Sequence, residues 1–452
     1  MTIKQFEDKP LAHYSYAILS EGKMALVDPA RDPMPYYGFA EENNAEIVAV
    51  FETHPHADFV SSHLQIYEET GATIYASKLL GADYPHKAFD DGDSFIMGDL
   101  FFEAINTPGH SPDSITVIAT DKQGKKAMFT GDTLFVGDVG RPDLREKVGN
   151  MKAKREEMAA SMYHTIQNKY SHLPDDTWVY PAHGAGSLCG SNLGGESSST
   201  LGNERVVNWA FKNLSEAEFV NHLLNDQPFI PAYFGYDVAI NKRGAVNLAS
   251  SISKVPFRAN VGRVGKDFPV VDTRDEKFFK KNRLPNSINI MSRNEDDKIE
   301  TWLGSIIKPQ ERFYLVVDSV KNIHPVLERI AKIGYEAQVQ KVMTLANNSL
   351  ESSTNMDFFD FKEHQERYTI LDIRNRSEVR EGRIFDNAIN IPLNELRESI
   401  DQVPTSKPVV VHCAGGYRSA AGSSIVAGKL KDTQVFDLGD RVNEYQTPSL
   451  RK

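Results

Sequence analysis

The sequence predicts an α/β protein with a layered N-terminal part and two copies of a smaller unit behind it. Short apolar runs alternate with segments of helical spacing over the N-terminal half, which is typical of a layered α/β domain. Beyond residue 262, the order strand, Asp-x-Arg, helix, strand and strong apolar strand occurs twice. This repeat indicates two doubly wound α/β units.

The N-terminal elements follow from apolar runs that are separated by turn residues. Residues 14–27 predict a hairpin that turns at Glu21-Gly22-Lys23. Helical spacing predicts one helix over 59–69, before Gly71, and another over 151–169. Further strands are expected at 47–54, 72–77, 100–105, 115–120, 126–132 and 177–183.

Domain boundaries follow from the repeat and from the composition of the stretches around it. Several prolines and glycines favour an extended connection over 226–262, and the polar run at 346–355 favours a second linker. The expected order is a first domain over 1–225, the linker 226–262, a first repeat over 263–345, the linker 346–355 and a second repeat over 356–452.

Charge and composition exclude several classes of protein. The chain carries 51 Lys and Arg against 62 Asp and Glu, a net charge of −11, which argues against nucleic-acid and anionic-membrane partners. It has neither an apolar stretch of membrane-spanning length nor a signal peptide at its start, so we expect a cytoplasmic protein. The two cysteines, Cys189 and Cys413, are too few for a disulfide scaffold.

Metal-binding side chains gather at the ends of several predicted strands. His54, His56 and Asp58 lie within five residues where the strand 47–54 ends. His110, Asp132 and His183 follow three later strands. Imidazole and carboxylate groups are the usual ligands of first-row metals, so these side chains predict a metal site.

Four short motifs in this order resemble the metallo-β-lactamase superfamily. They are Thr53–Asp58, Thr107–His110, Thr130–Asp132 and Pro181–His183, and the resemblance covers about residues 5–225. It implies an αββα sandwich with a metal site at one edge of its two sheets. In the usual pattern H-x-H-x-D-H, the last histidine binds a second metal.

Here Phe59 stands at that last position, and a phenyl ring cannot coordinate a metal. A two-metal hydrolytic site is therefore compromised. A single metal could use His54, His110 and Asp132 instead. Two histidines and one carboxylate leave open positions for O₂ and a substrate, as in non-haem iron oxygenases.

Residues 53–58, 131–135 and 140–143 resemble the persulfide dioxygenases in their T-H-x-H-A-D, G-D-x-L-F and G-R-x-D motifs. The resemblance implies that His54, His110 and Asp132 bind a mononuclear non-haem Fe(II). It also implies that His56, Asp58 and His183 orient the ligands or bind water. The implied substrates are O₂ and a small-molecule thiol persulfide, which is oxidised to sulfite and the parent thiol.

Two further residues are candidates for contact with the substrate. Arg141 either pairs with Asp143 and braces the loop after Asp132, or binds a substrate anion. Cys189, six residues after His183, is either a small buried side chain or a thiol that accepts sulfane sulfur at the metal pocket.

A second chemical site lies in the second repeat, where the apolar strand 409–412 runs into a cysteine loop. Backbone N–H groups of such a loop can stabilise a thiolate, and Arg418 can hold an oxyanion. Together with L-D-x-R at 371–374 and A-x-N-I-P at 388–392, the loop resembles the rhodanese sulfurtransferases. The alternative is a phosphatase of the same fold, which would carry one more residue between the cysteine and the arginine. The four residues between Cys413 and Arg418 therefore favour sulfur transfer. The loop residues are Cys413, Ala414, Gly415, Gly416, Tyr417, Arg418 and Ser419.

The first repeat has Ser319 and His324 where the second has Cys413 and Arg418, so we expect it to be a non-catalytic spacer or assembly surface. The whole chain resembles the bacterial fusions of a persulfide dioxygenase with an inactive and an active rhodanese domain. That resemblance implies sulfide detoxification, in which Cys413 passes sulfane sulfur to sulfite and forms thiosulfate. We also expect a homo-oligomer, a dimer or a tetramer.

Two other functions remain open at this point. One is a zinc thioester hydrolase of the hydroxyacylglutathione-hydrolase type, which needs the two-metal pattern that Phe59 interrupts. The other is a non-enzymatic sulfur carrier or scaffold with a structural metal, although structural zinc sites are closed and usually rich in thiolates.

Overall fold

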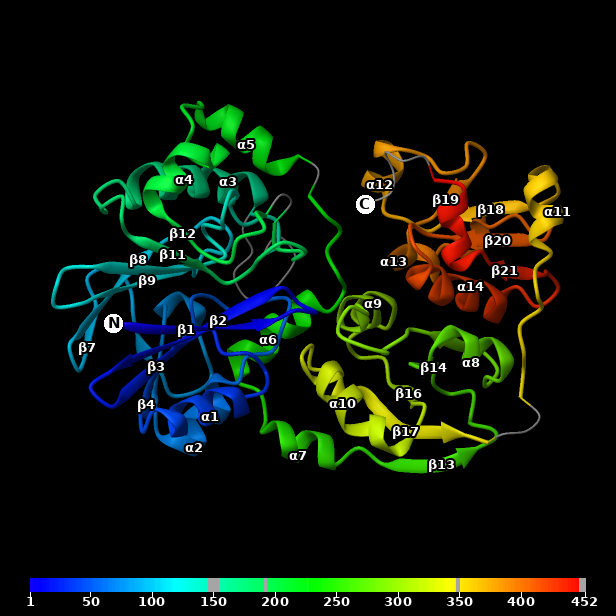
Figure 1. The fold of residues 1–452 in the computed structure, drawn as a ribbon, viewed down its shortest axis with the longest axis horizontal. Coiled ribbons are helices and arrows are strands. Elements are labelled where there is room, and N and C mark those ends of the chain that lie inside the picture. The colour runs from blue at the N-terminus through cyan, green and yellow to red at the C-terminus, as the bar shows by residue number, and fades with distance from the viewer. Residues whose placement is uncertain (145–153, 191–192, 226, 347–349, 447–452) are drawn as a thin grey trace. The chain divides into compact units, whose positions relative to one another are not determined.

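The first of the chain's two compact units contains two stacked sheets with helices on both outer faces (Figure 1). The computed structural model describes residues 1–144, 154–190, 193–225, 227–346 and 350–446. The first unit holds residues 1–250 and 331–334, and the second holds 251–330 and 335–452. Among the described residues, no helix has both the length and the apolar character that a bilayer span requires.

The first sheet of this unit runs in the order β1-β2-β3-β4-β5-β6. Apolar side chains from β2, β3 and β4 pack against those of the second sheet to form the central core. Helices α1 (Met34–Glu42) and α2 (His63–Thr70) pack on the outer face. The strands are β1 (Thr2–Asp8), β2 (His13–Ser20), β3 (Lys23–Val27), β4 (Glu46–Phe51), β5 (Thr73–Ala76) and β6 (Lys87–Ala88).

The second sheet runs in the order β12-β11-β10-β9-β8-β7, and helices α3 and α5 cover its outer face. The sandwich is therefore αββα, as predicted. The strands are β7 (Ser94–Met97), β8 (Leu100–Asn106), β9 (Ile115–Thr120), β10 (Lys126–Gly131), β11 (Trp178–Pro181) and β12 (Ser199–Thr200). The helices are α3 (Arg155–His164), α4 (Leu201–Val207), α5 (Glu216–Leu224), α6 (Phe234–Arg243) and α7 (Leu248–Ser253).

Most predicted strands of this unit are confirmed within one or two residues, although β4 ends at Phe51 rather than at 54. The hairpin turn is also confirmed, because Glu21 and Gly22 both have positive φ angles, 51° and 70°. The predicted helix 151–169 is present as α3 and a π-helical turn over Thr165–Lys169, while its residues 151–153 lie outside the described part.

The predicted start of the helix at residue 59 is wrong, because α2 begins at His63. The side chain of Asn241 forms hydrogen bonds with backbone groups at the start of the predicted helix. Its Nδ2 donates to the carbonyl oxygens of His56 and Phe59 at 2.8 and 2.7 Å, and its Oδ1 accepts from the N–H of Ser61 at 2.8 Å. The preceding loop is held in a non-helical form.

The prediction of an extended connection over 226–262 is also wrong. Its described residues contain α6, α7 and strand β13 (Phe257–Val261). Pro228 and Pro231 precede α6, and Pro256 follows α7, so the prolines border the helices and do not interrupt them. Helix α6 buries the apolar side chains of Phe234, Val238 and Ile240, which stabilises it within the first unit.

The second unit contains two parallel sheets of related order. The first runs β13-β17-β16-β14-β15 and the second runs β21-β20-β18-β19, so four strands of each repeat follow one topology. This agreement confirms the predicted internal repeat, with β13 added at one edge. The strands of the first repeat are β14 (Val270–Asp272), β15 (Ser287–Asn289), β16 (Phe313–Val316) and β17 (Val339–Leu345). Those of the second are β18 (Thr369–Asp372), β19 (Ile389–Asn390), β20 (Val409–His412) and β21 (Val435–Asp437).

Helices accompany each of these sheets. Those of the first repeat are α8 (Glu276–Lys281), α9 (Ile299–Ile306) and α10 (Ile323–Ala331). Those of the second repeat are α11 (Phe358–Glu363), α12 (Arg376–Glu381), α13 (Leu393–Leu396) and α14 (Tyr417–Lys429). In both repeats an arginine closes back on the aspartate two residues before it: Arg274 on Asp272 and Arg374 on Asp372, each at 2.7 Å.

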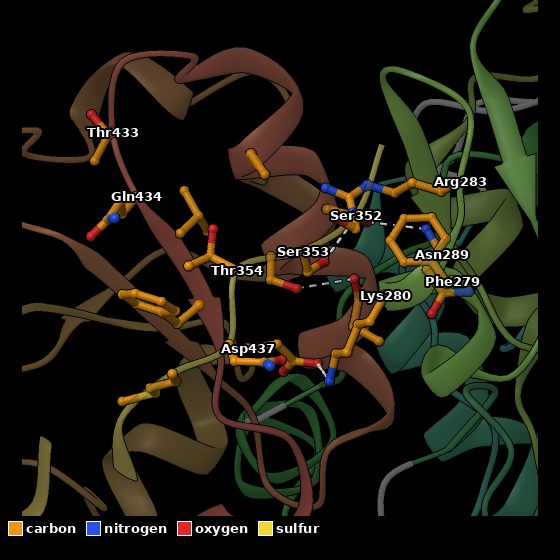
Figure 2. Close-up of a pocket in the computed structure, with 18 of the residues that line it drawn as sticks. Phe279, Lys280, Arg283, Asn289, Ser352, Ser353, Thr354, Thr433, Gln434 and Asp437 are labelled. Atoms are coloured by element: carbon orange, nitrogen blue, oxygen red, sulfur yellow. Dashed lines mark hydrogen bonds and ion pairs between the residues drawn. The ribbon is translucent and has the colours of Figure 1, made fainter. Parts of the chain in front are cut away.

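The predicted linker 346–355 packs against the first repeat over its described residues, while 347–349 lie outside the described part. Glu351 pairs with Arg283 in an isolated β-bridge. The N–H of Ser353 donates to the carbonyl oxygen of Lys280 at 2.7 Å (Figure 2). The stretch is therefore fixed to the end of α8.

Candidate functional site

The predicted metal ligands converge in the first unit. His54 follows β4, His110 follows β8, and Asp132 follows β10. Nε2 of His54 and Nε2 of His110 lie 3.8 and 3.5 Å from Oδ2 of Asp132. All three side chains are buried, and their candidate ligand atoms lie within 4.8 Å of one another.

These three residues fit a metal ion. Two ligands that each stand about 2.0–2.2 Å from one ion lie roughly 3 to 3.5 Å apart, which is close to the distances here. Oδ2 of Asp132 is buried and makes no hydrogen bond. A metal ion at this point would bind that oxygen. Without a partner, a buried polar atom of this kind costs folding free energy.

The charge states of these residues also suit coordination. Burial lowers the pKa of His54 and of His110, so both imidazoles are neutral and have a free lone pair. Burial disfavours the charge on Asp132, yet the nearby His183 holds the pKa of this carboxyl well below its usual range. The centre therefore combines two neutral imidazoles with one carboxylate.

His183 lies between two carboxylates. Its Nδ1 lies 2.7 Å from Oδ1 of Asp132, and its Nε2 lies 2.8 Å from Oδ2 of Asp58. Burial lowers the pKa of His183, but these two carboxylates raise it well above its usual value. Both ring nitrogens are thus engaged in ion pairs, and the ring orients Asp132 in this structure.

Two glycines allow the chain to pass close to this centre. Gly131, with a φ of +53°, stands where a Cβ atom would collide with Thr53. A Cβ atom at Gly140 would collide with the carbonyl group of Asp132. These contacts explain why glycine precedes Asp132 and Arg141 in the two motifs of this loop.

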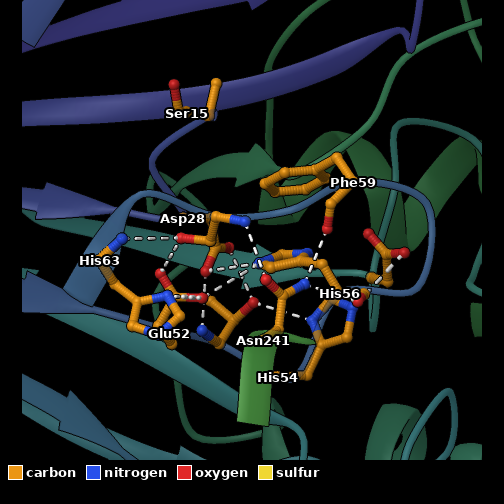
Figure 3. Close-up of polar contacts among 12 residues, drawn as sticks. Ser15, Asp28, Glu52, His54, His56, Phe59, His63 and Asn241 are labelled. Carbon is orange, nitrogen blue, oxygen red and sulfur yellow. Dashed lines mark hydrogen bonds and ion pairs between the residues drawn. The ribbon is translucent and has the colours of Figure 1, made fainter. Parts of the chain in front are cut away.

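A second buried polar cluster lies beside His54 and was missed by sequence reasoning, apart from His56 (Figure 3). Nε2 of His56 lies 3.1 Å from Oδ1 of Asp28 and 3.9 Å from Oε2 of Glu52. Asp28 also accepts from the N–H and the hydroxyl of Thr53, both at 2.7 Å. Because Thr53 Oγ1 lies 3.0 Å from Nδ1 of His54, this cluster fixes the orientation of a candidate ligand.

The ring of Phe59 packs against two histidine rings. The ring of Phe59 is 1% exposed, and its centroid lies 4.4 Å from that of His56 and 3.9 Å from that of His13. His13, at the start of β2, carried no local motif that could have revealed it. Phe59 therefore adds apolar packing where the superfamily pattern places an imidazole.

Of the two alternatives for Arg141, the structure shows the brace. Its guanidinium donates to Asp143 at 2.7 and 2.9 Å, to the carbonyl of Leu188 at 3.1 Å and to that of Pro228 at 2.7 Å. The side chain is 1% exposed. Four of its five N–H bonds are used internally, which leaves little capacity for an anion.

Cys189 lies close to the metal cluster. Its sulfur and the candidate ligand atoms of Asp58 and His183 lie within 4.8 Å of one another. Burial, followed by the charges of Asp58 and Asp132, raises the pKa of the Cys189 thiol well above its usual value. Cys189 is therefore a buried thiol next to Asp58 and His183, a position that leaves both alternatives open.

The cysteine loop of the second repeat follows β20 and leads into α14. The N–H of Gly416 donates to Sγ of Cys413 at 3.1 Å. Gly416 has a φ of +101°, and a Cβ atom there would lie 2.9 Å from the backbone nitrogen of Asp440. The Ala414 carbonyl accepts from Gln446, and Ser419 Oγ donates to the Gly416 carbonyl at 2.9 Å, so the curled loop is fixed at both ends.

Arg418 is held by Glu378, which sequence reasoning missed. Its Nη1 and Nη2 donate to the two carboxylate oxygens at 2.6 and 2.7 Å. Burial raises the pKa of Glu378, but the Arg418 hydrogen bonds hold it below its ordinary value. Glu378 is also the third residue of the α12 capping box with Asn375, a pattern visible in the sequence.

A pocket of about 640 Å³ lies elsewhere in the second unit (Figure 2). Two of its cations are already paired: Lys280 with Asp437 at 2.8 Å, and Arg283 with the Ser353 hydroxyl at 2.7 Å. Cys413 and Arg418 do not line it. This pocket is therefore separate from the cysteine loop.

Two parts of the chain match known families. Residues 8–183 match the metallo-beta-lactamase superfamily, and residues 359–445 match the rhodanese-like domain. The chain joins a metallo-beta-lactamase domain to a rhodanese-like domain. The metal cluster lies at loops of the former, and the cysteine loop lies in the latter.

Relatives of the metallo-beta-lactamase domain include persulfide dioxygenases and hydroxyacylglutathione hydrolases. Human mitochondrial persulfide dioxygenase is 29% identical over 223 residues, which are 49% of this chain and 79% of that protein. A hydroxyacylglutathione hydrolase from Rhizobium johnstonii is 35% identical over 167 residues, 36% of this chain and 57% of that protein.

A solved structure extends the comparison. A metallo-beta-lactamase from Staphylococcus aureus subsp. aureus COL has a TM-score of 0.67 and 29% identity, and the match covers 76% of this chain and 99% of that one. Persulfide dioxygenase relatives and a rhodanese-like domain in one chain support a role in sulfur metabolism.

Proposed function

We propose that the metallo-beta-lactamase domain oxidises a low-molecular-weight thiol persulfide with O₂, and that the rhodanese-like domain then forms thiosulfate. In the first reaction, a persulfide, O₂ and water give sulfite and the parent thiol. In the second, the Cys413 thiolate attacks the outer sulfur of a second thiol persulfide, the S–S bond of that persulfide breaks and its parent thiol is released. Sulfite then attacks the outer sulfur now on Cys413, the new S–S bond breaks, and the Cys413 thiolate leaves. The two reactions together serve sulfide detoxification.

One observation carries the first part of this proposal. His54, His110 and Asp132 form a buried set of two imidazoles and one carboxylate, while Phe59 takes the position of a second metal's imidazole. Such a set suits a single iron(II), which when bound supplies the redox chemistry for O₂ and open positions for two reactants. His183 keeps Asp132 oriented, and the ring of Phe59 packs against His56.

The residues of the cysteine loop divide the second reaction between them. The N–H of Gly416 lies close enough to Sγ of Cys413 to stabilise a thiolate or the inner sulfur of a persulfide. Arg418 carries the positive charge that a sulfite anion requires, and Glu378 fixes the plane of its guanidinium. Ser319 and His324 cannot replace these groups in the first repeat.

A second candidate function has an observation of its own. Asp58, His183 and Cys189 form another buried set of possible ligands, and a thiolate at Cys189 could stand in for the imidazole that Phe59 removes. A dinuclear zinc hydrolase that cleaves thioesters would use this set. Phe59, whose ring cannot coordinate a metal, favours the single-metal alternative.

The test combines metal analysis with an oxygen electrode. Protein purified without oxygen is loaded with iron(II) or zinc and then given glutathione persulfide or a glutathione thioester. We expect the iron-loaded protein, and not the zinc-loaded protein, to take up O₂ and form sulfite. Thiosulfate should form when that sulfite reacts with a sulfur donor. Thioester cleavage by zinc protein without O₂ uptake would establish the hydrolase instead.

A further inference from the structure

The first repeat, which lacks a cysteine and an arginine at the catalytic positions, contacts the catalytic loop of the second repeat directly. The hydroxyl of Tyr417 donates to the carbonyl oxygen of Met291 at 2.8 Å. The ring of Trp302, on α9, lies against Arg418, with the guanidinium carbon 5.6 Å from the ring centroid. These contacts involve the two loop residues that directly follow Gly416.

A third contact joins the same two repeats about two helical turns further along α14. The backbone N–H of Asn289, at the end of β15, donates to the hydroxyl of Ser424 on α14 at 3.0 Å. Because α14 begins at the cysteine loop, these contacts fix the position of the helix and of the loop relative to the first repeat. Ser424 is buried, so this hydrogen bond is shielded from water.

The segment of the first repeat that carries these contacts is itself held by a network of ion pairs. Arg329 contacts Glu300 at 2.7 Å, and Arg293 contacts Asp297 at 2.8 Å. Arg329 also donates to the carbonyl oxygen of Asn294 at 2.6 Å. Met291 and Trp302 lie at the two ends of this segment. The network therefore gives both of them a fixed place, as a positioning surface requires.

Trp302 of the first repeat helps to bury the charged side chain of Arg418. Glu378 binds one edge of the guanidinium, and Trp302 covers one face, so the side chain is only 14% exposed. An aromatic face attracts a cation within about 6 Å and excludes water without adding a competing anion. The N–H groups that Glu378 does not use remain the donors for a small oxyanion.

From these contacts we infer that the first repeat forms part of the sulfur-transfer site, with Trp302 as a positioning residue for Arg418 and hence for the sulfite or thiosulfate anion. This inference rests on the proposed sulfur transfer at Cys413, and it replaces the expected role of a mere spacer. Trp302 does not react. Its ring shields from water the cation that the anion meets, and the Met291 carbonyl anchors the neighbouring Tyr417.

Steady-state sulfur transfer from thiosulfate to cyanide in the full-length chain tests the inference. Trp302→Leu is expected to raise KM for thiosulfate by about tenfold and to change kcat by less than about threefold, since it removes a cation–π contact and leaves Cys413 intact. Trp302→Phe keeps an aromatic face and should recover most of the loss. Trp178→Leu, at a half-exposed tryptophan in the other unit, is the matched control and should leave KM unchanged.

A second measurement separates positioning from general stability. Addition of thiosulfate should alter the intrinsic tryptophan fluorescence of the wild-type chain, and Trp302→Phe should abolish that response while the thermal midpoint changes little. The inference is overturned if Trp302→Leu keeps the wild-type KM, or if Trp302→Phe responds to thiosulfate as the wild type does. A wild-type chain that transfers no sulfur at all would instead overturn the proposed function.

Discussion

Nδ1 of His183 lies 2.7 Å from Oδ1 of Asp132, and both side chains are buried. The other oxygen of this carboxylate faces the Nε2 atoms of His54 and His110. One oxygen of Asp132 is thus fixed by a charged imidazole, while the second stays free for a metal. A carboxylate that is oriented in this way loses less freedom when a metal binds.

His183→Gln tests that relationship. The substitution removes the imidazolium that holds Asp132, so we expect iron affinity to fall by about 10- to 100-fold, the usual cost of losing a partner of a metal ligand. Competition with a chelator under anaerobic conditions measures it. His172→Gln, at an exposed histidine, is the control. Unchanged iron affinity in His183→Gln would show that Asp132 needs no such partner.

Phe59→His tests the aromatic block. A histidine at this buried position restores the superfamily pattern next to Asp58, so we expect greater zinc retention and weaker iron-dependent O₂ uptake. Phe59→Leu removes the ring without adding a ligand, and it should keep the wild-type preference for iron. If Phe59→His leaves the metal preference unchanged, then Phe59 is not what excludes a second ion.

The buried cluster around His56 predicts a pH dependence of stability. Burial raises the pKa of Glu52 from 4.5 to about 8. Between pH 4.5 and pH 8, Glu52 is therefore protonated in the folded chain and ionised in the unfolded chain. The contribution of Glu52 to the free energy of unfolding should therefore be greatest below about pH 4.5. It should fall as the pH rises from about 4.5 to about 8, by at most about 1.4 kcal/mol per pH unit.

Glu52→Gln removes this titration. Urea unfolding of the metal-free protein at pH 5.5, 6.5 and 7.5 should give a flatter profile for this variant than for the wild type, because the amide binds no proton in either state. Glu41→Gln, at an exposed carboxylate, should keep the wild-type slope. A wild-type slope in Glu52→Gln would place the titrating proton elsewhere.

Cys413→Ser and Asp132→Asn should separate the two activities. The serine variant lacks the sulfur nucleophile, so we expect loss of thiosulfate formation and unchanged O₂ uptake with glutathione persulfide. The asparagine variant lacks the anionic ligand, so it should lose O₂ uptake and keep sulfur transfer from thiosulfate to cyanide. Both assays are run on both variants, and a joint loss in either one would contradict independent chemistry at the two sites.

Cys189→Ser tests whether the buried thiol takes part in persulfide oxidation. Its sulfur lies beside Asp58 and His183, so we expect slower turnover with the persulfide and an unchanged iron content. The rate of O₂ uptake is measured with several persulfide carriers. If turnover stays the same with every carrier, Cys189 is only a small buried side chain.

The sequence predicted the elements and residues that carry strong local patterns. Strand ends with imidazole and carboxylate groups pointed to His54, His110 and Asp132 as candidate ligands, whose ligand atoms lie close together in the structure. Strands β8 and β10 run in the same direction, so their carboxyl ends lie at one edge of their sheet. The glycine-rich loop at Cys413 and the repeated Asp-x-Arg pattern identified the two α/β repeats. In each case neighbouring residues in the chain contain the whole signal.

Contacts between distant parts of the chain were not predictable in this way. Asn241, on a helix expected to be an extended connection, donates to the backbone before α2 and fixes the loop of His56. Trp302 and Arg418 are separated by more than a hundred residues, and neither carries a pattern that names the other. Burial and tertiary packing, rather than local propensity, decide these positions.

Metal stoichiometry in catalytically active protein tests the central claim most directly. The chain is purified without oxygen, analysed for metals by mass spectrometry, and followed for O₂ uptake with glutathione persulfide in the same preparation. We predict one iron per chain, with one O₂ consumed for each sulfite or thiosulfate formed. Two zinc ions per chain in active protein, with thioester cleavage and no O₂ uptake, would contradict it.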